Sequence, residues 1–225
     1  MESEQTIDLK HRFFYALLFI FTGLSVFAVS YFTGKSYEAI LRNTIVSLIV
    51  TGTVIFTIFD AFSRGSDGFS YDNFYHRNRF IVVYAIFIVL ACFLGLVPNQ
   101  FWPYMSFFVI LGLFSNTEIG LISGTGLVCV SVMLEENSSF GELFMYVIAG
   151  AVALALFRDL KENTSIVFPT VICLMMQALL LIAFSVLFQN RTLSINLLIL
   201  PILNLMLNLI ILLIFLNIFG VYIIR

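Results

Sequence analysis

The sequence predicts an all-α protein, a polytopic transmembrane helix bundle of about eight spans, two of them short, with both termini in the cytoplasm. The 225 residues are 61% hydrophobic and only 11% charged, whereas ordinary globular domains are about 45–50% apolar and about 25% charged. The apolar residues form runs near the ~20 residues that cross a hydrocarbon core. One membrane domain is expected to cover residues 1–225.

Six apolar runs are near membrane length and are expected to form transmembrane helices. They cover residues 13–32, 44–62, 79–97, 143–157, 166–188 and 193–222. The first run is of full membrane length and lacks a convincing small-residue cleavage site. It is therefore expected to stay in the mature protein as a helix and not to act as a signal peptide.

Residues 102–134 form a longer apolar stretch, interrupted by Ser-Asn-Thr-Glu at residues 115–118. The stretch is either one long tilted helix or two short helices of ~14–17 residues, which would each rise about 21–25 Å. Pro98 and Pro103 mark its start. Trp102 and Tyr104 stand where an interfacial aromatic belt would lie.

Positive charge decides between these alternatives. Two helices give eight spans and eight Lys and Arg residues inside against three outside, whereas one helix gives six against five. Short cytoplasmic loops normally carry the Lys and Arg excess, so we expect eight spans in the plasma membrane and an external loop at residues 135–139. The inside residues are then Lys10, Arg12, Arg64, Arg77, Arg79, Arg158, Lys161 and Arg225, and the outside residues are Lys35, Arg42 and Arg191.

Several function classes are not favoured by the sequence. The net charge of −2 is too small to indicate a nucleic-acid partner, and no cofactor is expected. No Walker A loop, nucleophile elbow or His-Asp doublet occurs, and Asp60, Asp67, Asp72 and His76 match no ligand spacing of a metal site. The three cysteines lie far apart in apolar runs, where buried small hydrophobic side chains are expected.

Polar and small residues inside the spans each have a structural and a functional interpretation. Glu118 opens a Gly-rich span, where the helix dipole favours a carboxylate; we expect it to be hydrated at the cytoplasmic boundary, with gating or ion sensing as the alternative. Gly120 and Gly124 form a small-xxx-small pair that is expected to serve close helix packing. A ligand-lining unwound segment is the alternative for these glycines.

Three amides lie within the last two predicted spans. Gln177 is near the centre of one span, and Asn204 and Asn208 are one turn apart in the next, so both asparagines share a helix face. We expect hydrogen bonds across helices, which are worth about 0.6–2 kcal/mol each in membranes. A substrate path is the alternative.

The order of features from about Phe101 onward is distinctive. A helix that begins Phe-Trp-Pro-Tyr turns at residues 116–118 into a Gly/Val-rich helix. An acidic outer loop, an Ala-rich run at 146–157 and the charged turn Arg-Asp-Leu-Lys at 158–161 follow. This order resembles the membrane region of the seven-transmembrane-receptor HD phosphohydrolases of bacteria, and the resemblance covers roughly the last 150 residues.

In that family, one helix precedes an extracellular sensory domain, and seven more lead to a cytoplasmic HD hydrolase that cleaves cyclic dinucleotides. The resemblance implies a membrane-anchoring, signal-receiving domain whose partners are the lipid bilayer and a cytoplasmic catalytic domain after Arg225. The connection at residues 34–42 is too short for the sensory domain, so external sensing of the usual kind is not expected. No catalytic, cofactor-binding or metal residue of the family falls within this chain.

Two other function classes stay open. A small-molecule transporter, or the substrate-binding subunit of one, is indicated by the Gly-rich span and by the amides Gln177, Asn204 and Asn208. A cell-envelope assembly protein that acts only by contacts is the other class. An intramembrane enzyme is not favoured, because no nucleophile–base pair occurs. A homodimer is an open alternative for the assembly state.

Overall fold

The computed structural model describes residues 2–63, 74–135, 140–157, 167–189 and 195–223, and their regular structure is helical throughout. The predicted all-α class is confirmed for these residues, and a helix occupies most of each of the six plain apolar runs. The elements are α1 (Glu2–Phe32), α2 (Tyr37–Ser63), α3 (Phe74–Leu94), the 3-10 turn η2 (Asn99–Phe101), α4 (Tyr104–Phe114), α5 (Thr117–Leu134), α6 (Phe140–Leu156), α7 (Val167–Gln189) and α8 (Ile195–Ile223).

A tight turn joins α1 and α2. Gly34 has a φ of +71°, a left-handed conformation that suits glycine at the end of a helix. The next N–H, that of Lys35, donates to the carbonyl of Ser30 at 3.3 Å. The hydroxyl of Ser36 then accepts from the N–H of Ala39 at 3.3 Å, which caps the start of α2.

The long apolar stretch is two helices, as the charge distribution predicts, and the break falls at Ser115–Asn116. Asn116 is the N-cap of α5, and its side chain accepts from the N–H of Ile119 at 2.7 Å. The expected length of ~14–17 residues for each helix was wrong, because α4 has 11 residues and α5 has 18. At 1.5 Å per residue α4 is about 16 Å long, roughly half of a hydrocarbon core.

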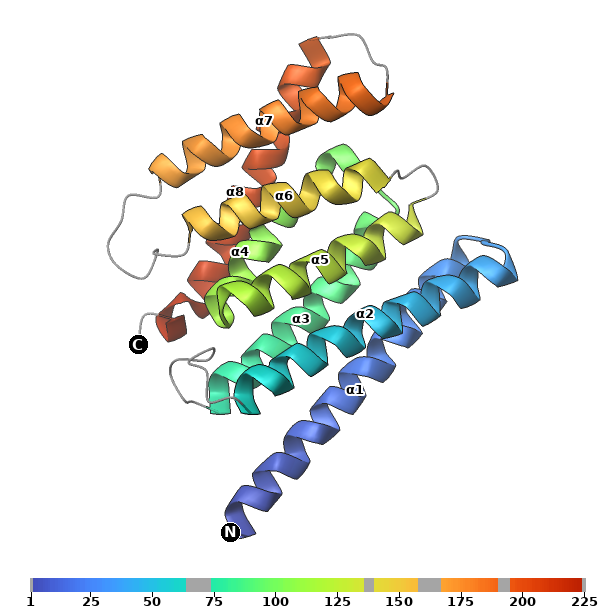
Figure 1. The fold of residues 1–225 in the computed structure, drawn as a ribbon, viewed down its shortest axis with the longest axis vertical. Coiled ribbons are helices and arrows are strands. Elements are labelled where there is room, and N and C mark those ends of the chain that lie inside the picture. Colours follow the sequence, from blue (N-terminus) through green and yellow to red (C-terminus); the bar gives the residue numbers. More distant parts are fainter. Residues whose placement is uncertain (1, 64–73, 136–139, 158–166, 190–194, 224–225) are drawn as a thin grey trace.

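The helices are layered along the long axis of the molecule. Figure 1 shows α1 and α2 at one end of this axis, α7 at the other, and α3, α5 and α6 between them. The short helix α4 contacts α3, α5, α6 and α8. We call the side of the bundle with the connections 33–36 and 95–103 and with Glu135 the Lys35 end, and the opposite side, where α4 turns into α5, the Asn116 end.

The short helix α4 is enclosed by protein, since every residue from Tyr104 to Leu111 is buried. The ring of Phe108 lies between two helices at positions where only glycine fits. A Cβ atom would approach this ring to 2.5 Å at Gly124 and to 2.3 Å at Gly150. Helices α5 and α6 therefore pack on α4 through Phe108.

Three helices are long and apolar enough to cross a membrane by length and composition. Their apolar segments are Arg12–Phe32, Tyr37–Asp60 and Thr117–Leu134. Shorter apolar segments lie in α3, α4, α6, α7 and α8. The three long segments indicate membrane association.

Replacing Gly150 with alanine is expected to destabilise the protein by about 1–3 kcal/mol, the usual cost of overpacking a closed core. The ring of Phe108 cannot move away, because Gly124 lies on its other side. Thermal unfolding of the purified chain in detergent measures the effect. Gly52→Ala is the matched control, since its added Cβ meets only Phe19 at 3.6 Å. Equal melting temperatures of the two variants would contradict this packing.

Candidate functional site

Asn204 of α8 is fully buried and joins three parts of the bundle. Its Nδ2 donates to the carbonyls of Gln100, at 2.9 Å, and Trp102, at 3.0 Å. Its Oδ1 accepts from Gln177 Nε2 of α7 at 2.7 Å and from Asn208 Nδ2 at 2.6 Å. A single amide therefore connects α7, α8 and the segment that leads into α4. We call Gln177, Asn204 and Asn208 the amide cluster.

Asn208 supplies the hydrogen bond that the first turn of α4 lacks locally. Pro103 is the N-cap of α4 and makes no side-chain cap hydrogen bond. Asn208 Oδ1 accepts instead from the N–H of Ser106 at 2.7 Å. The first N–H groups of a helix have no partner within it, and water is absent from the bilayer core. Capping from another helix therefore fixes the position of α4 against α8.

The amide cluster is a neutral hydrogen-bonding site, without an acid, a base or a nucleophile among its three members. Gln177 is 4% exposed, and its Oε1 is a buried acceptor for which the described part of the chain provides no hydrogen-bond donor. A cavity of about 410 Å³ lies elsewhere, at the Lys35 end, and no amide of the cluster lines it. The amide cluster can therefore hold α7, α8 and the start of α4 in fixed positions relative to one another.

Aromatic side chains close the same region on the side of the Lys35 end. Trp102 Nε1 donates to the carbonyls of Leu94, at 2.7 Å, and Val97, at 3.0 Å. Its ring lies edge-on to Tyr104, with centroids 5.6 Å apart. The prediction that Trp102 and Tyr104 belong to an interfacial belt was wrong in one respect, because both are fully buried in protein. The ring of Trp102 is held inside the protein because its indole N–H donates to carbonyls at the end of α3 and in the following turn.

The other predicted site residues lie on α5. Glu118 is exposed in the first turn of α5, at the Asn116 end. Gly120 and Gly124 are buried against α4, and a Cβ atom at Gly120 would lie 2.6 Å from Cα of Gly112. Because α5 is a continuous helix through both glycines, this segment is not unwound. The structure thus brings Gln177, Asn204 and Asn208 together and leaves the α5 residues apart from them.

Two hydroxyl residues that no sequence pattern singles out take part in this region. Ser106 donates its hydroxyl to the carbonyl of Pro103 at 2.7 Å. Ser131 hydrogen-bonds the hydroxyl of Tyr104 and the carbonyl of Ala91. A serine in an apolar run carries no sign of its partner, so neither contact could be predicted from the sequence.

A pair of carboxyl groups lies at the Lys35 end. Burial raises the pKa of the Glu135 carboxyl above its ordinary value, and the nearby Glu142 carboxylate raises it further. A hydrogen bond from the backbone N–H of Asn99 opposes this shift. The carboxyl of Glu135 thus binds its proton more tightly than a hydrated glutamate does.

Within the described residues, no group of three or more His, Cys, Asp and Glu side chains could hold a metal ion. Asp67 and Asp72 lie outside these residues. The three cysteines are free; Cys92 and Cys173 are buried and Cys129 is half-buried. The expected burial of cysteine is thus confirmed for two of the three.

The chain matches no protein-family model, no curated protein and no solved structure. The resemblance to the membrane region of HD phosphohydrolases therefore stays a prediction.

The amide cluster makes a quantitative prediction. In a double-mutant cycle, Gln177→Leu and Asn204→Leu are expected to couple by about 0.6–2 kcal/mol, because they remove the same hydrogen bond. Asn204→Leu alone is expected to lower the free energy of unfolding by about 1–3 kcal/mol, since it also leaves the buried carbonyls of Gln100 and Trp102 without a hydrogen-bond donor. Thermal unfolding in detergent measures both. Met206→Leu, on the exposed face of α8, is the control, and zero coupling would contradict the cluster.

Proposed function

We propose that this chain is a multi-pass membrane domain that anchors a cytoplasmic domain. The observation that carries the membrane part is the distribution of polarity. Large apolar side chains face outward while polar side chains are enclosed, the reverse of a water-soluble bundle.

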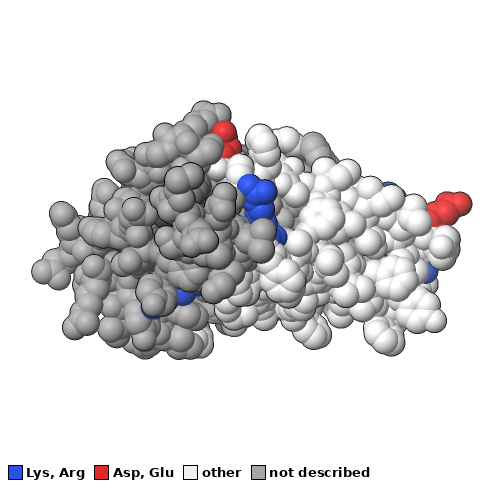
Figure 2. Space-filling model, turned by 90° about the horizontal axis from the view of Figure 1, so that it is seen from below, with Lys and Arg blue, Asp and Glu red and all other residues white. Residues whose placement is uncertain are grey.

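The outer surface is apolar on the helices at both ends of the long axis. Leu24 of α1, Ile49 and Phe56 of α2, and Leu179 of α7 are 60–69% exposed. Soluble monomers rarely expose contiguous apolar patches larger than a few hundred Å². On the face seen in Figure 2, charged side chains lie in a few separate places and the remaining described surface is uncharged. Lipid tails are the solvent that suits such a surface.

The interior contains the opposite residue types. Hydroxyl and amide side chains are buried on α1, α2, α4, α5, α7 and α8, and most of them bond to backbone groups or to one another. The hydroxyl of Ser30 has no hydrogen-bond partner among the described residues. In lipid such groups must find partners inside the protein. Those at most 1% exposed are Thr22, Ser30, Asn43, Ser47, Thr51, Ser106, Ser123, Ser131, Asn204 and Asn208.

Eight spans with both termini in the cytoplasm suit this arrangement. The α4–α5 turn is at the end opposite the 33–36 and 95–103 connections, so α4 and α5 run antiparallel and count as two passes. The 11 residues of α4 need not match the bilayer thickness, because protein surrounds them. The Lys35 end then faces outward, and Arg12 and Arg79 lie at the cytoplasmic end, in keeping with the positive-inside rule.

Anchoring is favoured over transport by the packing of the small residues. A substrate path could be lined by Gly120, Gly124 and Gly150. The space beside these glycines is occupied by α4, including the ring of Phe108. The amide cluster uses most of its hydrogen-bonding capacity within the bundle. A closely packed bundle with an internal hydrogen-bonded hub is suited to holding an attached domain in a fixed orientation.

The orientation is tested by cysteine labelling after the native cysteines have been replaced by alanine. Ser36→Cys, at the Lys35 end, is expected to react with a membrane-impermeant maleimide in intact cells. Thr117→Cys, exposed at the Asn116 end, is expected to react only after permeabilisation. Labelling of both sites, or of Thr117→Cys alone, in intact cells would contradict the proposed topology.

The attached domain is tested separately. If the resemblance reflects function, the coding sequence beyond Arg225 is expected to continue into a soluble segment with a His-Asp doublet, whose purified form hydrolyses cyclic dinucleotides in the presence of a divalent metal. A soluble segment without that doublet would reject the HD phosphohydrolase part of the proposal and leave the membrane topology untouched.

A further inference from the structure

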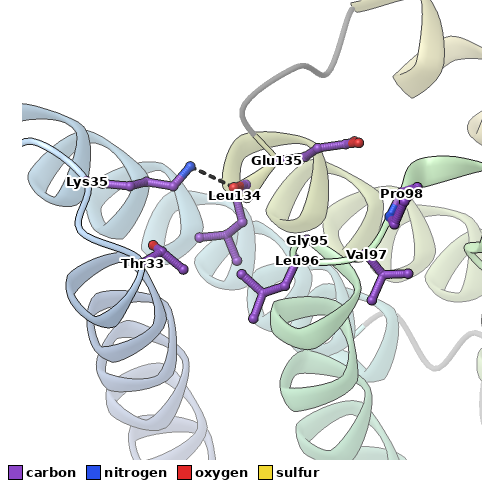
Figure 3. Close-up of a pocket in the computed structure, with 8 residues that line it drawn as sticks. All are labelled: Thr33, Lys35, Gly95, Leu96, Val97, Pro98, Leu134 and Glu135. Atoms are coloured by element: carbon purple, nitrogen blue, oxygen red, sulfur yellow. Dashed lines mark hydrogen bonds between the residues drawn. The ribbon is translucent and has the colours of Figure 1, made fainter.

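The cavity at the Lys35 end has a volume of about 410 Å³, within the range of 300–1,000 Å³ that is usual for small-molecule pockets. Three connections meet there: the α1–α2 turn, the segment after α3 and the end of α5. The residues that line the cavity include Thr33, Lys35, Leu96, Val97, Leu134 and Glu135 (Figure 3).

The rim of the cavity carries both signs of charge. Lys35 Nζ donates to the carbonyl of Leu134 at 2.6 Å, which holds the ammonium group at the C-terminal end of α5, where the helix dipole favours a cation. Glu135 lines the same cavity. A ligand with an anionic and a cationic group suits this rim better than a ligand of one sign.

The opposite side of the cavity is apolar. In Figure 3, Lys35 and Glu135 lie on the side of the loops, and Leu96 and Val97 lie on the side of the helices. These two side chains are 52% and 41% exposed. The neighbouring Phe93 is 60% exposed on α3, so apolar surface continues away from the cavity along the helix. A charged rim above an apolar wall is the arrangement that an amphiphile requires.

We propose that this cavity binds the headgroup of a phospholipid that carries both a phosphate and a primary ammonium group, the chemistry of phosphatidylethanolamine. The phosphate pairs with Lys35, the ammonium group lies toward Glu135, and the acyl chains follow the apolar surface beside Leu96 and Val97. The inference rests on the proposed function, since it requires the Lys35 end to lie at a membrane surface. The exposed apolar wall favours a lipid over a free zwitterion.

Native mass spectrometry of the purified full chain in mild detergent tests this inference. The chain is titrated with phosphatidylethanolamine, phosphatidylglycerol and free phosphoethanolamine at equal concentrations. Phosphatidylethanolamine is expected to give about fivefold more adduct than phosphatidylglycerol, and free phosphoethanolamine none. Lys35→Gln is expected to lower the phosphatidylethanolamine adduct about fivefold, the effect of one cation near a lipid headgroup. Arg42→Gln, exposed on α2 and outside the cavity, should match the native chain.

A second variant separates binding from folding. Leu96→Trp fills the apolar side of the cavity at a half-exposed position and leaves both charges in place, so it is expected to lower the phosphatidylethanolamine adduct while the melting temperature stays near that of the native chain. Equal adducts of the two lipids, no effect of Lys35→Gln or Leu96→Trp, or equal binding of free phosphoethanolamine would overturn the inference. Because no bilayer is used, a failure of the labelling at Ser36 would reject the orientation alone.

Discussion

A helix that begins inside a membrane protein needs acceptors for its first N–H groups, and no water is available to provide them. In this protein Asn208 provides that acceptor for α4, at Ser106. Asn204 holds the chain just before α4 through the carbonyls of Gln100 and Trp102. The position of α4 thus depends on two amides of α8, and the packing of the neighbouring helices depends on α4.

The central place of α4 explains features that are unusual when taken singly. Its length is about half of a hydrocarbon core, which is tolerable because α3, α5, α6 and α8 surround it. Its ring at Phe108 requires glycine on α5 and α6, at Gly124 and Gly150. Most buried polar side chains form hydrogen bonds inside the bundle, and the outer helices present apolar surface. The same arrangement that satisfies α4 therefore leaves a surface suited to lipid.

Much of the fold followed from the sequence because its causes are local. The apolar runs predicted the helices, the Ser-Asn-Thr-Glu interruption at residues 115–118 marked the boundary between α4 and α5, and the i, i+4 spacing placed Asn204 and Asn208 on one face. The choice of two helices over one followed from the distribution of positive charge. This distribution indicates on which side of the membrane a residue lies and says nothing about the local backbone conformation. The partners of Lys35 and of the amides could not be predicted, since these side chains bond to groups distant in the sequence. Such contacts exist only after the helices have packed.

Hydrogen exchange in a lipid nanodisc, read by mass spectrometry on peptides of α4, tests the central claim most directly. Amides of residues 104–114 are predicted to be the slowest of the chain to exchange, despite the shortness of the helix, because α4 is capped by Asn208 and enclosed by protein. In the Asn208→Leu variant these amides are predicted to exchange faster, with the first turn affected most. If α4 exchanges as fast as the connections at the Lys35 end, or if Asn208→Leu leaves its exchange unchanged, α4 is not the element that organises the bundle.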